Sequence, residues 1–132
     1  WRPTAFLDRN LGNDASNRAI GAWGCAIDEG FTREYHDAVY ANQPEEEGDG
    51  WSNSELVSIA EDIGMSGATL ESFSACVDDE TYRVWAANST QEFYDQGVAG
   101  TPFGNIDGVE IPTQSLADQA SLLAALTEAA SN

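Results

Sequence analysis

The chain has 132 residues, 42% of them apolar, and its 23 acidic residues against 5 basic ones give a formal net charge of −18. This length allows one domain with a real apolar core, and four Trp, four Tyr and five Phe argue against a disordered chain. A field of that sign repels phosphate backbones and anionic membrane surfaces, so nucleic acid is not expected as a partner.

The sequence contains no run of 18 apolar residues, so no membrane-spanning helix is expected. No signal peptide is visible, and the chain starts at Trp1 without Met. We therefore expect a processed or truncated piece, whose targeting segment or membrane anchor lay upstream.

The first elements predicted along the chain are a short strand at residues 4–7 and a helix from about 14 to 28. Asp14 or Ser16 can cap this helix, and Gly30 stops it. Four residues at three- and four-residue spacing predict its buried face: Ala19, Trp23, Ala26 and Ile27.

Two further helices surround the acidic loop at residues 45–50. Thr32 is predicted to cap a helix over residues 33–41, which ends before Pro44. Ser52 and Glu55 have the spacing of a capping box and open a helix that ends at Gly64.

The second half of the chain is predicted to hold three more helices. Ser66 opens a short one, and Asp78 or Asp79 caps a longer one that reaches Gln96. The last is predicted from Thr113 or Ser115 to about residue 129. Five apolar residues are expected on its core face: Leu116, Ala120, Leu123, Ala124 and Leu126.

Residues 97–111 are predicted to form a loop and a hairpin. The dipeptide Asp107-Gly108 lies between two short apolar-containing runs, which is a strong hairpin signal. Pro102, just before the first run, cannot donate to a strand ladder and belongs at a strand start or an exposed edge.

This segment resembles the cis-proline loop and final hairpin of DsbA-like thioredoxin-fold proteins. The motif is Val98-Ala99-Gly100-Thr101-Pro102, followed by a strand, Asp-Gly and a second strand. Two other strings strengthen the resemblance: Arg-Pro-x-x-Phe-Leu-Asp at residues 2–8, and Tyr-His-Asp-Ala at residues 35–38 followed by Asn-Gln-Pro at 42–44.

The resemblance implies an α/β fold of the thioredoxin-like, DsbA type with a helical insertion, mostly helical in this chain and with a small sheet. Residues 1–13 and 97–132 would be a partial thioredoxin-like domain, and residues 14–96 the inserted helical subdomain. Thr101 and Pro102 would bind the backbone of the substrate. One strand and one hairpin would make a marginal three-stranded layer with an exposed edge.

Cys25 and Cys76 are the two cysteines of the chain, 51 positions apart on two predicted helices. They could be a redox pair or a structural staple. The spacing lacks the CxxC geometry that lowers the pKa of a thiol, and two cysteines in a secreted-looking chain favour a structural disulfide. The resemblance points the same way, because actinobacterial DsbA-like proteins carry a second disulfide in the insertion.

The CxxC of the family is absent from this chain, and thiol–disulfide exchange needs an attacking thiolate beside a resolving thiol. One hypothesis is part of an extracytoplasmic oxidoreductase, acting on protein substrates with thiols or disulfides and not competent alone. Trp23, Trp85 and Phe73 would then fill the core of the insertion. The alternative is a non-catalytic binding or scaffold module that kept the fold.

Other candidate sites have plainer explanations. His36, the single histidine, has no nucleophile motif nearby, and a surface or capping role is expected. One His and two distant Cys do not make a zinc site, so no metal or other cofactor is expected. The acidic run at residues 45–49 lacks the pattern of a calcium loop, and the Asn88-Ser89-Thr90 glycosylation pattern falls within a predicted helix.

Overall fold

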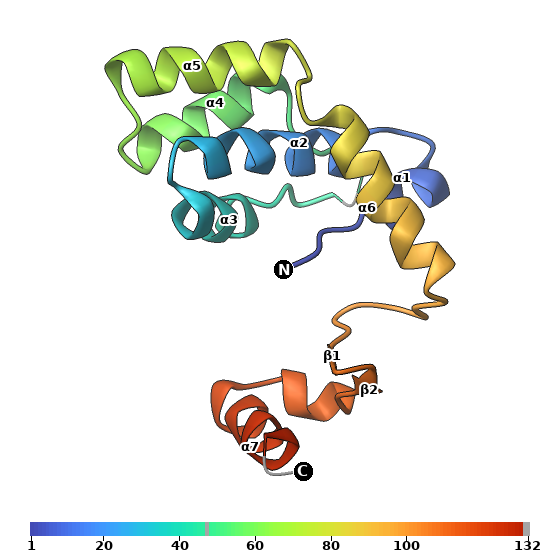
Figure 1. The fold of residues 1–132 in the computed structure, drawn as a ribbon. Helices are drawn as coiled ribbons and strands as arrows, with labels where there is room; N and C mark the ends of the chain where they lie inside the picture. The colour runs from blue at the N-terminus through green and yellow to red at the C-terminus, as the bar shows by residue number, and fades with distance from the viewer. Residues whose placement is uncertain (47, 131–132) are drawn as a thin grey trace. The chain divides into compact units, whose positions relative to one another are not determined.

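A computed structural model describes residues 1–46 and 48–130 of the chain (Figure 1). It divides into two compact units, Trp1–Tyr94 and Asp95–Asn132. The first unit is helical, and the second holds a hairpin, a short 3₁₀ helix and a final helix. The assignment of residues 1–13 and 97–132 to one thioredoxin-like domain, with 14–96 inserted, stays a prediction.

The first unit is built around helix α2 (Ala15–Asp28), which makes its most extensive contacts with four other helices. These are α1 (Phe6–Leu11), α3 (Thr32–Ala41), α4 (Asn53–Asp62) and α5 (Gly67–Asp78). In the view of Figure 1, α5 and α4 are drawn above α2 and α3 below it, and α3 also contacts α4 directly. The largest fully buried side chains of this core are Tyr35, Phe73, Leu56 and Cys25.

Helix α4, which begins at Asn53, agrees closely with its prediction from the sequence. The Ser52 hydroxyl accepts from the Glu55 backbone N–H, and the Glu55 carboxylate accepts from the Ser52 backbone N–H, which completes the capping box. Leu56, Ile59 and Ala60 are buried as their spacing predicts.

Asp14 is the N-cap residue of α2, as one of the two predictions had it, but the side-chain cap comes from α1; Ser16 lies inside the helix, so that alternative is wrong. The Asp8 carboxylate of α1 accepts from the backbone N–H groups of Ser16 and Asn17, each at 2.8 Å. Asp14 makes no cap bond, because its carboxylate pairs with Arg18 at 2.5 Å. Trp23 and Ala26 are buried, whereas Ile27 is exposed.

The strand predicted at residues 4–7 is wrong: helix α1 begins at Phe6. Its backbone finds partners without a neighbouring strand, since the Ala5 N–H donates to the Thr90 hydroxyl and the Ser89 hydroxyl to the Pro3 carbonyl. Phe6 stacks on Phe93 with ring centroids 5.7 Å apart. The described residues therefore form a two-stranded sheet in place of the expected three-stranded layer.

Helix α6 (Arg83–Asp95) starts later than predicted. Asp78 still belongs to α5 and Asp79 is the C-cap of that helix, so neither residue caps α6. The turn between the helices holds Glu80 at a φ of 51°. Ala86 is buried on α6, but Trp85 is 37% exposed and does not fill the core as expected.

The second unit carries the hairpin of β1 (Asn105–Ile106) and β2 (Val109–Glu110), the 3₁₀ helix η1 (Thr113–Leu116) and helix α7 (Gln119–Ala129). Helix α7 is capped by Asp118, not by Thr113 or Ser115. Its predicted core face is wrong, because Leu123 is 60% and Leu126 44% exposed, and Ala120 and Ala124 are also exposed. The second unit is short, so few of its described residues are available to pack against α7.

Candidate functional site

The hairpin loop has the geometry that its sequence predicts. Asn105 pairs with Glu110 and Ile106 with Val109 in antiparallel register. Asp107 and Gly108 both adopt positive φ, 51° and 84°, as the turn between the two strands requires.

The peptide bond between Thr101 and Pro102 is cis, and both residues are exposed. Phe103, the next residue, is 41% exposed. Within the part of the chain that the structure describes, neither Thr101 nor Phe103 uses its backbone N–H or C=O in a hydrogen bond. These groups are therefore free to pair with an extended polypeptide.

Gly104 gives this segment its close packing. An added Cβ would lie 3.2 Å from the Leu116 side chain and 3.3 Å from the Ile111 side chain. The Gly104 carbonyl accepts from the Ile111 N–H at 2.8 Å, and Ile111 is buried. The glycine thus holds the loop against the interior of the second unit.

The cysteines lie in the first unit, where Cys25 of α2 and Cys76 of α5 form a disulfide with their Cα atoms 5.9 Å apart. Cys25 is 1% exposed and Cys76 half-buried. The chain contains no free cysteine. Neither sulfur is available as a thiolate while the disulfide is intact.

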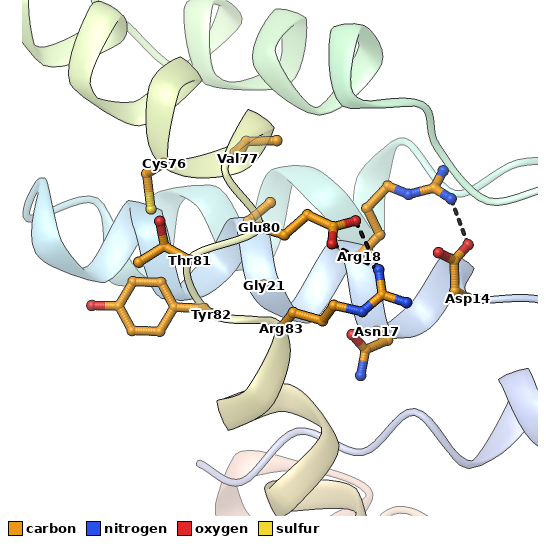
Figure 2. A pocket seen from close by; sticks show the side chains of 11 residues that line it. Asp14, Asn17, Arg18, Gly21, Cys76, Val77, Glu80, Thr81, Tyr82 and Arg83 are labelled. Carbon is orange, nitrogen blue, oxygen red and sulfur yellow. Dashed lines mark hydrogen bonds and ion pairs between the residues drawn. The ribbon is translucent and has the colours of Figure 1, made fainter.

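A small pocket beside this disulfide is shown in Figure 2. It lies among α2, the end of α5 and the start of α6, and it encloses only about 20 Å³, enough for a single water molecule. The charges at its rim are already paired, Arg18 with Asp14 and Arg83 with Glu80 (Figure 2). It has no room for a substrate.

A wider, open depression of about 370 Å³ is lined by α1, α2 and α6. It mixes charges of both signs, including Asp8, Arg9 and Arg83. The Arg9 guanidinium lies 5.9 Å from the centre of the Tyr94 ring. The Asp8 carboxylate already caps α2, so these groups serve packing and capping.

His36 is half-buried among aromatic rings, with its Nδ1 2.9 Å from an Asp37 oxygen. Hydrogen bonding to His36, together with Arg33, holds the pKa of Asp37 below its usual range. Tyr35 beside it is buried, and its hydroxyl donates to the Leu56 carbonyl at 2.9 Å. Burial raises the pKa of Tyr35, so this phenol stays neutral and structural.

The remaining candidates show no site chemistry. Over residues 1–46 and 48–130, no three His, Cys, Asp or Glu side chains gather to hold a metal ion. In the acidic run, Glu47 lies outside the described residues. Thr90 of the glycosylation pattern is occupied by hydrogen bonds to Ala5 and Ala86. No described helix is long and apolar enough to cross a membrane.

Comparison with known proteins identifies the family. The family model described as Thioredoxin matches residues 5–126, and the chain belongs to this thioredoxin family. The fold is similar to that of the MdbA protein, a thiol-disulfide oxidoreductase from Actinomyces oris, with a TM-score of 0.70 at 20% identity. No curated protein sequence matches the chain.

The match to MdbA covers 91% of this chain and 60% of that chain, so this chain spans less than two thirds of the relative. The thioredoxin-like, DsbA-type fold that the motifs at residues 2–8, 35–44 and 98–102 indicated is confirmed. The role of Thr101 and Pro102 in substrate binding stays a prediction.

Proposed function

We propose that the chain is part of a DsbA-like thiol–disulfide oxidoreductase that acts on exported proteins, and that it is not competent alone because it carries no CxxC. The observation that carries the proposal is the free backbone of Thr101 and Phe103, exposed beside Pro102 at the mouth of the hairpin. An unfolded substrate can pair with such groups as an added strand.

Within this proposal, the two cysteines of this chain have a structural role, and a CxxC elsewhere has the redox role. Both are used in the disulfide between α2 and α5, which staples the helical unit and leaves no nucleophile. A disulfide persists in oxidising compartments, which favours an extracytoplasmic location. The CxxC would come from residues outside this chain, as would any membrane anchor.

Hydrogen exchange of the chain with a short, extended, uncharged peptide tests the binding role. The expected result is slower exchange at the Thr101 and Phe103 amides, with Leu56 in α4 as an unaffected reference. Thr101→Pro removes one of the two N–H groups and should lower the protection that remains measurable at the Phe103 amide, whereas Thr101→Ser should keep it. Peptide binding that leaves both loop amides unprotected would refute the role of the loop.

An insulin-reduction assay tests whether the chain alone lacks thiol–disulfide exchange activity, as we propose. The chain alone is expected to give no reduction above that of dithiothreitol by itself. Activity that disappears in Cys25→Ser/Cys76→Ser would instead make this disulfide the redox centre.

The alternative is a non-catalytic binding or scaffold module with the same fold. The pairing of both cysteines in a disulfide is compatible with it, as it is with the first proposal. It predicts no protection of the loop amides by unfolded peptides, which separates it from the first proposal in the same exchange experiment.

A further inference from the structure

Six rings form a continuous series across the first unit, and we call them the aromatic strip: Tyr82, Trp85, Trp23, Trp1, His36 and Tyr40. Their consecutive ring centroids lie 4.3–6.2 Å apart. The rings come from the first residue of the chain and from helices α2 and α3, and from α6 with the turn before it. Residues that are distant in sequence thus build one surface.

Much of this surface faces solvent although its centre is anchored. Trp23 is only 8% exposed, and its indole N–H donates to the Thr32 carbonyl at 2.7 Å. By contrast Trp1 is 75%, Tyr40 63% and Trp85 37% exposed. Exposed Trp and Tyr on a rigid support are the residues that carry most binding energy in protein interfaces.

The charged residues around the aromatic strip indicate which kind of partner it would bind. Asp28 at one end accepts a hydrogen bond from the Tyr82 hydroxyl at 2.5 Å, and Asp37 lies beside His36 at the other. A cation at the rim, Arg33, is paired with Asp37 at 3.5 Å.

The whole chain carries a net charge of −18, so a second copy would be repelled. A cationic partner would be attracted. Lys and Arg are also held over the faces of Trp and Tyr rings by the ring quadrupole.

We propose that the aromatic strip binds an extended cationic polypeptide, with Arg or Lys side chains over the exposed rings of Trp1, Trp85 and Tyr40. The proposal goes beyond the thiol-exchange function, because it concerns the first unit alone and uses neither the cysteines nor the hairpin loop.

Fluorescence anisotropy with a labelled peptide of alternating Arg and Gly tests it. Tyr40→Ser should weaken binding about threefold, and Tyr40→Ser/Trp85→Ser about tenfold, as expected for the loss of one and two cation–ring contacts. Tyr94→Ser is the matched control, because Tyr94 is 39% exposed in the same unit but outside the strip. Its affinity should stay within twofold of the original chain.

Three outcomes would overturn the proposal. The first is that the original chain does not bind the peptide. The second is that Tyr40→Ser and Tyr94→Ser both bind as tightly as the original chain, which would show that net charge alone attracts the peptide. The third is equally tight binding of a peptide with Ser in place of Arg, which would show that the surface does not recognise positive charge. Circular dichroism of each variant checks the fold. Failure here leaves the protection of the Thr101 amide unaffected, so the two proposals are tested separately.

Discussion

Replacing Gly24 with alanine tests how closely α2 approaches the turn before α6. A Cβ at this position would lie 2.5 Å from Cγ of Tyr82, 2.8 Å from Cδ1 and 2.9 Å from Cβ. These atoms are at the near end of the side chain, so relief requires movement of the turn and strains the Tyr82 bond to Asp28. Overpacking of this kind costs about 1–3 kcal/mol.

The opposing effect is the better helix propensity of alanine, about 1 kcal/mol relative to glycine in a helix interior. The steric overlap outweighs this gain, and we expect Gly24→Ala to destabilise the protein by about 1 kcal/mol. Gly21→Ala is the matched control in the same helix, because its Cβ would meet no atom closer than 4.0 Å. That variant should gain about 1 kcal/mol.

Urea unfolding of the oxidised protein, followed by far-ultraviolet circular dichroism, measures both variants. We expect the midpoint to fall for Gly24→Ala and to rise for Gly21→Ala, with unchanged slopes and a difference of about 2 kcal/mol. Equal stabilisation by the two substitutions would refute the close approach of Tyr82 to α2.

Three further predictions concern the disulfide, a helix cap and pH. Urea unfolding of Cys25→Ser/Cys76→Ser should show a loss of about 4 kcal/mol, since the bond closes a loop of 51 residues; an unchanged midpoint would contradict this. Asp8→Ala should cost about 1 kcal/mol because it uncaps α2, whereas Asp14→Ala should cost clearly less if Asp8 is the cap. Backbone and side-chain hydrogen bonds at its helix cap lower the pKa of Glu55, so its contribution is present above the usual carboxyl range and is lost as pH falls through the lowered pKa. Urea midpoints from neutral to acid pH should therefore fall less steeply for Glu55→Gln than for the original chain.

Local patterns predicted much of the helical unit. The capping box at Ser52 and the apolar spacing after it define α4, since both act within a few residues of the chain. The turn at Asp107-Gly108 is equally local, because the preference for positive φ belongs to the two residues themselves.

Sequence patterns failed where distant residues decide the structure. Residues 4–7 have the composition of a strand, but the Thr90 and Phe93 side chains that hold this segment lie more than 80 positions away. The cap of α2 comes from Asp8 rather than from the residue before the helix. The aromatic strip could not be predicted for the same reason: Trp23 follows the core pattern of its own helix, and its ring neighbours belong to other segments.

The positions of the two cysteines and of the Thr101 loop limit how this chain could take part in thiol–disulfide exchange. An exchange reaction on a peptide held at Thr101 needs a thiolate, and the disulfide consumes both sulfurs of this chain. Reducing Cys25–Cys76 to supply one would remove the constraint that links α2 to α5 and expose a sulfur from the core of the helical unit. A reaction that depended on this pair would therefore weaken its own scaffold at every turnover. A separate CxxC would avoid this conflict, which supports the proposal that the disulfide serves stability and the loop serves binding.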